Sequence, residues 1–383
     1  MATVNQIYLM VNDATKEALG SKAIAVKGTS TLVSLGDLVL SSDKNKEAFY
    51  NALVDRIGKT VIAIRKFKST NRSIKRDEMN WGIIYQKISY KLHSAVNNGT
   101  WETETQVNPF DVEIQTEAVQ KLFSKIGTWS YEDSIPDRQL FSAFQNAAAM
   151  GAFIDGIFIN MDNAMTIAED ALADLAASTC IAGTLIKGKA TQKRNLLSEY
   201  NTKYSQTLTV SAALTNADFL KFASYEINQV VKHLKRPTTV YNAEGIPRQT
   251  TSEKMVVEIL DQFASATASY LESGTYHKEL VALPGYEEIS FWQASGEDFS
   301  FANCSTVNVT NSELITAGNE TGTIEQRGIV AFIHDYDAVA SCIYNVRTNT
   351  MYNPRAERMN IFKKADKGYA VDLSENSVVF YIA

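Results

Sequence analysis

Gly151–Lys187, with the sequence GAFIDGIFINMDNAMTIAEDALADLAASTCIAGTLIK, has the pattern of one long helix. It contains no proline, and its first basic residue is the closing Lys187. Its apolar side chains return every three or four positions, which is the spacing of a single buried helix face. They are Phe153, Ile154, Ile157, Phe158, Met161, Met165, Ala168, Leu172, Leu175, Ala176 and Cys180. Such a helix would span roughly 50 Å at 1.5 Å per residue, which exceeds the needs of a compact enzyme and suits a flat, elongated subunit.

The polar side of this predicted helix carries only negative charge. Its acidic residues are Asp155, Asp162, Glu169, Asp170 and Asp174. A carboxylate metal site in a helical bundle would add Glu-x-x-His motifs on partner helices, and the sequence contains none. We therefore interpret Asp162, Glu169, Asp170 and Asp174 as one face that is solvated or contacts another subunit.

The composition is that of a globular protein with room for one large domain or two to three smaller ones. Of 383 residues, 45% are hydrophobic and 21% are charged. The net charge of −6 argues against binding of nucleic acid as the main activity. No apolar run reaches the length of a membrane span, and no export signal is recognisable, so we expect a cytoplasmic protein. Three isolated cysteines, Cys180, Cys304 and Cys342, are expected to be reduced thiols.

The first third of the chain has few signs of an independent core. Residues 1–45 suggest a short helix near Asp13–Leu19 and extended chain at Thr31–Val33, as in an arm that is buried on another surface. Lys44–Ile57 has the four-residue spacing of a helix. Lys59–Tyr131 suggests a long two-stranded excursion, and a lone hairpin is unstable in water, so it must lie on something.

Residues 65–76 of the same excursion contain six positive charges and no acid. These are Arg65, Lys66, Lys68, Arg72, Lys75 and Arg76. A solvated basic loop explains them in an isolated domain, and a loop that reaches an acidic neighbour is the alternative.

The remainder of the chain mixes helices and strands. Asp133–Met150 is predicted to be a second helix capped by Asp133 or Ser134, and residues 187–206 a polar connector. Residues 207–340 alternate strands and helices, with helices at Asn216–Lys232 and Ser252–Tyr270, as in a separate α/β domain. Residues 338–383 read as β structure, so the fold class is α+β.

We find no motif that indicates catalysis. GxSxG, HExxH, GxGxxG and paired Cys/His clusters with zinc spacing are all missing from the sequence. The most enzyme-like cluster is His334-Asp335-Tyr336-Asp337, which alternating side chains after a strand explain equally well. We expect no enzyme activity, no cofactor and no metal, and keep a metal-dependent hydrolase that uses His334 as a remote alternative.

Two motifs resemble a known family. Ala52–Gly58 (ALVDRIG), followed by Val61 and Ile62, is similar to the segment before the extended loop in major capsid proteins of small short-tailed phages (podoviruses, within the Caudovirales) related to phi-twenty-nine. Met351–Arg355 (MYNPR) resembles the strand that these proteins send back near the C-terminus. The order of predicted elements between the two motifs also agrees with the family.

The resemblance implies a Hong Kong 97-type capsid fold and a shell protein of virions. By order along the chain, it implies the following parts: an N-terminal arm at 1–45, a helix leading into the extended loop at 46–58, the extended loop at 59–131, a peripheral domain with the long spine helix at 132–206 and 341–383, and an axial domain at 207–340. The implied partners are other copies in hexamers and pentamers, a portal protein at one vertex, and packaged double-stranded DNA bound without sequence specificity. No membrane is involved, and assembly would occur in the cytoplasm of a bacterial host.

The chain departs from this family in having no appended immunoglobulin-like domain and no long helical N-terminal extension, so we expect a separate scaffolding protein. The opposite charges of residues 65–76 and of the long helix suggest that the basic tip of one subunit lies over acidic residues of a neighbour. A cellular cage of the same fold, of the encapsulin type, is the alternative to a phage shell.

Overall fold

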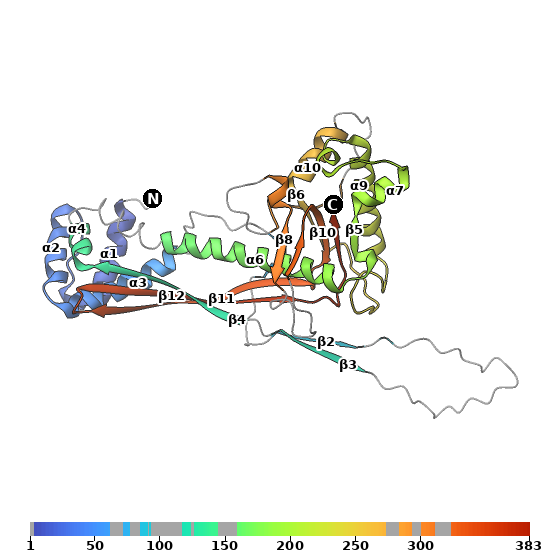
Figure 1. Ribbon diagram of the computed structural model, residues 1–383. Coiled ribbons are helices and arrows are strands. Elements are labelled where there is room, and N and C mark those ends of the chain that lie inside the picture. The colour runs from blue at the N-terminus through green and yellow to red at the C-terminus, as the bar shows by residue number, and fades with distance from the viewer. Residues whose placement is uncertain are drawn as a thin grey trace, which may run out of the picture.

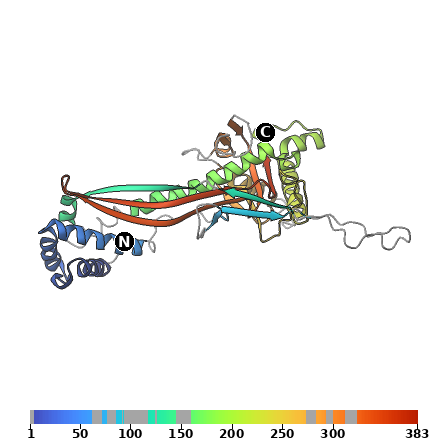
Figure 2. The same ribbon diagram turned by 90° about the horizontal axis from the view of Figure 1, so that it is seen from below.

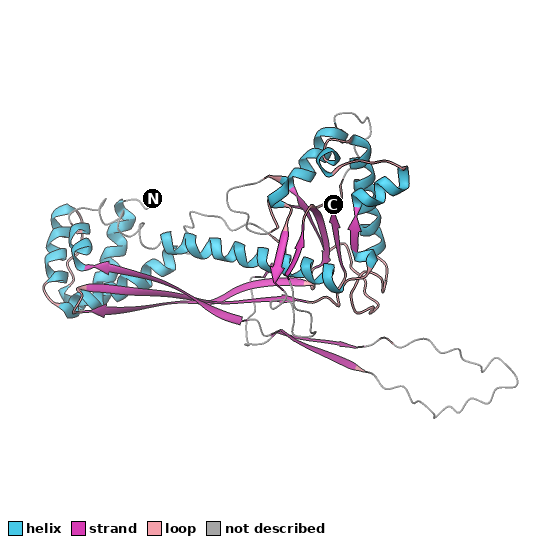
Figure 3. Ribbon diagram, in the orientation of Figure 1, coloured by secondary structure: helices cyan, strands magenta, loops and turns pink. Residues whose placement is uncertain are grey.

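The computed structural model describes residues 4–61, 72–76, 85–90, 92, 117–123, 126–144, 159–272, 283–292, 300–310 and 323–383. The molecule is elongated, with a group of N-terminal helices at one end and a sheet with covering helices at the other (Figure 1). A long helix and several long strands run between the two ends. Figure 3 shows the same division by element type.

The central element is α6 (Asn160–Lys187), a helix of 28 residues. It confirms the predicted long helix, of which residues 151–158 lie outside the described part of the chain. Its N-terminal end contributes Met161 to one hydrophobic core, and its C-terminal half contributes Ala176 and Cys180 to the other. The helix ends at Gly188, whose N–H donates to Thr184 O at 2.8 Å. A single helix therefore connects both cores.

The first core lies among the N-terminal helices α1 (Val4–Leu19), α2 (Thr29–Leu40) and α3 (Asp43–Val61) and the later helix α4 (Asp137–Ala143). Phe49 and Phe144 pack with ring centroids 5.5 Å apart, and both are buried. The expectation of extended chain at Thr31–Val33 and of little core in residues 1–45 is wrong. Leu32, Leu35 and Val39 recur at helical spacing and are buried, and Thr31 Oγ1 accepts the Gly28 N–H at 3.0 Å at the helix start.

A long twisted sheet runs between the two ends of the molecule (Figure 2). Its strands, in spatial order, are β1 (Lys75–Arg76), β11 (Val339–Asn353), β12 (Arg358–Val371) and β4 (Ile126–Pro136). The predicted helix start at Asp133 or Ser134 is wrong, because both residues belong to β4. Side-chain exposure alternates along residues 127–135, which is the period of a strand. Pro136 is the last residue of this edge strand, a position where a residue without a backbone N–H is tolerated.

A second sheet forms the other end of the molecule. Its strand order is β5 (Lys193–Asn195), β13 (Ser377–Tyr381), β10 (Ile329–Asp335), β6 (Met255–Leu260) and β7 (Glu287–Ile289). All seven residues of β10 are buried, as expected of a strand with neighbours on both faces. This sheet combines strands from the predicted peripheral and axial ranges, and the domain boundaries stay a prediction.

Helices of this end pack on the sheet. They are α7 (Leu196–Tyr204), α8 (Val210–Ala213), α9 (Ala217–Leu234), α10 (Asp261–Thr267) and α11 (Phe301–Cys304). The predicted helix at 216–232 is confirmed as α9, capped by Asn216, whose Oδ1 accepts the Phe219 N–H at 2.9 Å. The predicted helix at Ser252–Tyr270 is half wrong, because Met255–Leu260 is a strand, buried from Val256 onward, in which every residue except Glu258 is apolar. The prediction that residues 187–206 form only a polar connector is also wrong, since this range contains β5 and α7.

The remaining described elements are short. The 3₁₀ turns are Gly20–Lys22 and Ala190–Gln192, and a π-helical turn is Ala268–Glu272. Two hairpins are formed by β2 (Tyr85–Tyr90) with β3 (Ala118–Phe123), and by β8 (Val307–Thr310) with β9 (Thr323–Gln326). The first of them lies within the predicted excursion Lys59–Tyr131, whose described residues also include β1 and the start of β4 in the long sheet. Within the described residues, no helix has the length and apolar character of a membrane span.

Candidate functional site

Residues 72–76, here called the anchor segment, lie at the edge of the long sheet and contact α6. Ile74 is fully buried, and its carbonyl accepts the Ser341 N–H at 2.9 Å. Lys75 and Arg76 form β1, which pairs in parallel with β11. Backbone pairing and a buried apolar side chain therefore place the charged side chains of this segment at fixed positions.

Arg72 and Lys75 of the anchor segment meet acidic residues of the same chain. Arg72 donates from Nε at 3.0 Å and from Nη2 at 2.6 Å to the fully buried Glu258 of β6. A third donor, Nη1, contacts Asp174 of α6. Lys75 pairs with Asp170, one turn earlier on the helix. The charge complementarity that the sequence suggested between the basic cluster and the long helix thus occurs within one subunit at these four residues.

Arg76 binds the cluster that looked most like an enzyme site. Its guanidinium lies 3.3 Å from the centroid of the Tyr336 ring, donates to the Tyr336 carbonyl, and is 3.8 Å from Asp337 Oδ1. His334 is fully buried, its Nδ1 donates to Asp335 O at 2.8 Å, and burial lowers its pKa. Across the described ranges, no group of three His, Cys, Asp or Glu residues is placed to hold a metal ion. In this chain the cluster binds Arg76 through the ring and the carbonyl of Tyr336 and through the carboxylate of Asp337.

The other predicted site residues differ in burial and in their contacts. Asp162 is 4% exposed and pairs with Lys363 of β12, so its interpretation as a solvated residue is wrong. The cause is β12, which crosses the first turns of α6 and covers that side of the helix. Glu169 is half-buried and lines a cavity of about 200 Å³ with Lys75, Arg76 and residues of β11. Arg65, Lys66 and Lys68 lie outside the described residues.

The anchor segment makes stability depend on pH through Asp174. Burial and the nearby carboxylates Glu258 and Asp170 raise the pKa of Asp174 to about 6, against the attraction of Arg72. The folded state therefore binds this proton more tightly than the unfolded state, so protonation stabilises the fold. The contribution of Asp174 to the free energy of unfolding should rise as pH falls from 7 through 6.

We accordingly expect Asp174→Asn to be at least as stable as the wild type at pH 7, because the amide removes the buried charge and can still accept from Arg72. The variant should also gain less stability than the wild type between pH 7 and pH 5. Urea denaturation of both proteins across that range measures the difference. A clear loss of stability at pH 7 in the variant would mean that the ion pair with Arg72 outweighs burial.

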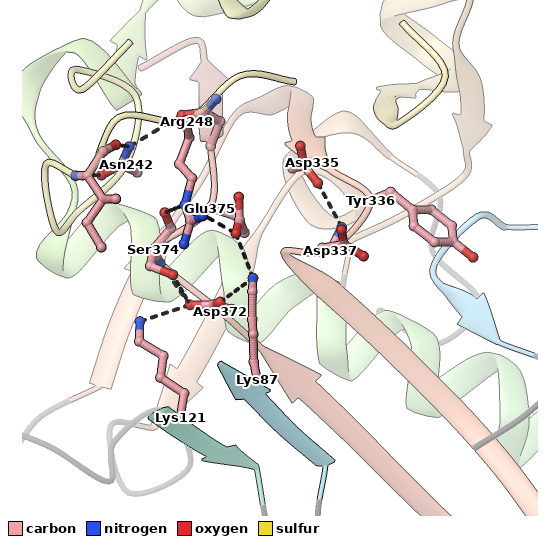
Figure 4. Close-up of polar contacts among 12 residues, drawn as sticks. Lys87, Lys121, Asn242, Arg248, Asp335, Tyr336, Asp337, Asp372, Ser374 and Glu375 are labelled. Atoms are coloured by element: carbon pink, nitrogen blue, oxygen red, sulfur yellow. Dashed lines mark hydrogen bonds and ion pairs between the residues drawn. The ribbon is translucent and has the colours of Figure 1, made fainter. Parts of the chain in front are cut away.

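A second charged cluster holds the β2–β3 hairpin on the body (Figure 4). Lys87 Nζ is 2.6 Å from Asp372 Oδ2 and 2.6 Å from Glu375 Oε1. Lys121 Nζ is 3.0 Å from Asp372 Oδ1 and also pairs with Glu244. Sequence reasoning missed this cluster, because single lysines in strands separated from their partners by 251 and 285 residues carry no local signal.

The opposite face of the hairpin carries exposed apolar side chains. Side chains at alternate positions of a strand lie on one face, so Ile88 and Tyr90 lie opposite to Lys87. Ile88 is 54% exposed, Tyr90 is 63% exposed, and Leu92, just after the strand, is 71% exposed. We call these three residues the outer stripe. One face of the hairpin is thus tied to its own subunit by charges, and the other offers an apolar surface.

Comparisons with known proteins agree with this architecture. Capsid coordinates from Staphylococcus phage Andhra match with a TM-score of 0.53 and 10% identity, covering 83% of this chain and 85% of that one. A structure of the head fiber and inner core protein gp22 of native bacteriophage P68 matches with a TM-score of 0.51 and 11% identity, covering 81% and 83%. At these identities the matches show the fold alone, which is the Hong Kong 97-like fold of phage capsids.

Sequence comparison gives the family. No curated protein matches the chain. A family profile described as Phi29-like phage major capsid protein matches residues 10–381, which is nearly the whole chain. The chain therefore belongs to the family of Phi29-like phage major capsid proteins.

Proposed function

We propose that this capsid shell protein joins copies of itself into hexamers and pentamers through the β2–β3 hairpin, whose outer stripe packs on a neighbouring subunit. The observation that carries the proposal is the contrast between the two faces of this hairpin. Its lysine face is paired with its own subunit, whereas Ile88, Tyr90 and Leu92 are more than half exposed. An exposed apolar row on a two-stranded hairpin is unfavourable in water and gains stability when a second copy covers it.

The remaining features support a container for double-stranded DNA. A net charge of −6 keeps the wall from binding the duplex tightly, so DNA can enter without sequence-specific contacts. A portal protein at one vertex and a separate scaffolding protein complete the proposed set of partners, with assembly in the cytoplasm of the bacterial host. We propose no catalytic role for the chain.

Family membership and element order support the domain ranges proposed from the sequence. These are the arm at 1–45, the helix at 46–58, the extended loop at 59–131, the peripheral domain at 132–206 and 341–383, and the axial domain at 207–340. Because Asp170 and Asp174 pair with Lys75 and Arg72 of the same chain, we assign the contact with an acidic neighbour to Arg65, Lys66 and Lys68.

The test of the proposal is a charge in the outer stripe. We expect Tyr90→Glu to abolish closed shells or reduce them strongly, because a carboxylate would have to be buried without a partner at each contact. The free energy of unfolding of the separate subunit should change by no more than about 0.5 kcal/mol, as for other exposed positions. Negative-stain electron microscopy and urea denaturation measure the two effects.

The matched control is Tyr90→Phe, which keeps the apolar ring and should assemble normally. Normal shells from Tyr90→Glu would refute the role of the outer stripe. Loss of assembly in Tyr90→Phe as well would point to the hydroxyl group rather than the apolar surface.

A further inference from the structure

The two lysines that hold the hairpin stand directly opposite each other. Lys87 and Lys121 are Cα partners in the register of β2 and β3, and both side chains reach toward the same part of the body (Figure 4). Like charges in this position destabilise an antiparallel pair. The arrangement is favourable here because one carboxylate, that of Asp372, takes one lysine on each oxygen, at 2.6 Å and 3.0 Å.

Asp372 is held in place independently of the hairpin. It lies in the turn between β12 and β13, and its side chain is 3% exposed. Its Oδ1 accepts the N–H of Ser374 at 2.9 Å and the hydroxyl of Ser374 at 2.7 Å, while its own N–H donates to Ala338 O at 2.8 Å. The turn therefore presents a carboxylate of fixed orientation, which a mobile surface side chain would not do.

The charges around Asp372 alternate and balance. Glu375 accepts from Lys87 and lies 3.3 Å from Arg248 Nε, and Glu244 pairs with Lys121. Removal of the Asp372 charge leaves three cations against two anions, with the two lysines side by side. The cations are Lys87, Lys121 and Arg248, and the remaining anions are Glu375 and Glu244.

Attachment through both strands has a mechanical consequence. A hairpin tied by one strand can roll about that strand, whereas ties at the same register position on both strands fix its roll and its tilt. The Tyr90–Ala118 pair marks the end from which the chain continues, roughly 10 Å beyond Lys87 at 3.3 Å per residue. A small change of angle at Lys87 and Lys121 therefore displaces Tyr90 and Ala118 by a larger amount.

We propose that Lys87, Lys121 and Asp372 form an electrostatic latch that sets the direction in which the hairpin leaves the subunit, and that this direction selects the angle between adjoining subunits of the shell. The second half of the inference rests on the proposed contact of the hairpin with a second copy. Because the latch depends on charge, loss of the Asp372 carboxylate or a high salt concentration releases the hairpin.

The latch is tested on separate subunits with spin labels on cysteines introduced as Gln120→Cys on β3 and Lys221→Cys on α9. Both positions are exposed, and the native cysteines are buried, so labelling is selective. We expect one narrow label-to-label distance distribution in the otherwise wild-type protein. Asp372→Asn should lose this narrow peak, although the amide oxygen can still accept from Ser374.

The control is Asp366→Asn. Asp366 lies on β12 and accepts from Arg347 and Asn345, but it contacts neither hairpin lysine, so the narrow peak should remain. High salt should broaden the distribution of the wild type and leave that of Asp372→Asn unchanged. A narrow peak that persists in Asp372→Asn would overturn the latch.

Electron microscopy of the same variants tests the role in shell geometry. We expect Asp372→Asn to form particles of mixed curvature or open sheets, and Asp366→Asn to form uniform shells. Uniform shells of wild-type size from Asp372→Asn, with a broadened distance distribution, would overturn the link between hairpin direction and subunit angle. The distance measurement decides the latch whether or not shells form, whereas a wild-type protein that never assembles would contradict the proposed function.

Discussion

Arg72→Ala should lower the free energy of unfolding of the subunit by about 3–5 kcal/mol, because it leaves a buried carboxylate without its partner. Glu258 is fully buried and takes two donors from Arg72, and Asp174 takes a third. The loss should be larger at pH 7 than at pH 5, because the pKa of Asp174 is raised to about 6 and a protonated Asp174 needs no cation beside it. Urea denaturation of the separate subunit, followed by tryptophan fluorescence, measures it.

The matched control is Arg327→Ala, which breaks an exposed ion pair with Glu325. Exposed pairs contribute about 0–1 kcal/mol, so this variant should stay close to the wild type. The double replacement Arg72→Met with Glu258→Met should recover much of the lost stability, since the fully buried carboxylate is removed together with its partner and only the partly exposed Asp174 loses a donor. Equal losses in Arg72→Ala and Arg327→Ala would show that the anchor segment is not held by its buried charges.

Gly328→Ala should cost about 3 kcal/mol or more, because it combines backbone strain with a steric clash. Gly328 has a φ of +75°, and a Cβ at this position would lie 1.9 Å from the carbonyl oxygen of Ile382. Its own carbonyl accepts the Ile382 N–H at 2.8 Å, next to the pairing of β10 with β13. The clash therefore forces apart two central strands of the second sheet, which a lower thermal transition temperature would record.

Gly20→Ala is the matched control for strain alone. Gly20 has a φ of +55°, and nothing lies within 4 Å of a Cβ at that position. Its replacement should cost about 1–2 kcal/mol, the usual penalty for a left-handed residue with a side chain. If both alanine variants lost the same stability, the contact with Ile382 would contribute nothing.

The elements that the sequence predicted well are those with local signals. Helix α6 has an unbroken apolar period over 28 residues, and α9 begins at a side-chain cap on Asn216. Helix α2 was not predicted, because Gly28 precedes its short apolar run and Gly36 lies within it. Strand β6 was predicted to be part of a helix. A short buried apolar segment has the same composition in either structure, and its partner strands decide which one forms. For β6 these partners are β10 and β7, which are distant in sequence.

The sequence predicted which charges attract each other at the candidate site, but not that they meet within one subunit. The opposite charges of Arg72 or Lys75 and of Asp170 or Asp174 are visible in the sequence, and the structure brings them together. Their contact within one subunit was not predictable, because 95 and 102 residues separate the partners. Asp372 gave no sign of its role, since its orientation depends on a turn whose hydrogen bonds appear only in the folded chain.

The most direct test of the proposed shell contact is a cryo-electron microscopy reconstruction of assembled particles that resolves the β2–β3 hairpin. We predict a closed shell of hexamers and pentamers. In each subunit, Lys87 and Lys121 should contact Asp372 of the same chain, while Ile88, Tyr90 and Leu92 pack on a neighbour. A closed shell in which the outer stripe faces solvent, or in which the two lysines bind a neighbouring subunit, would contradict it.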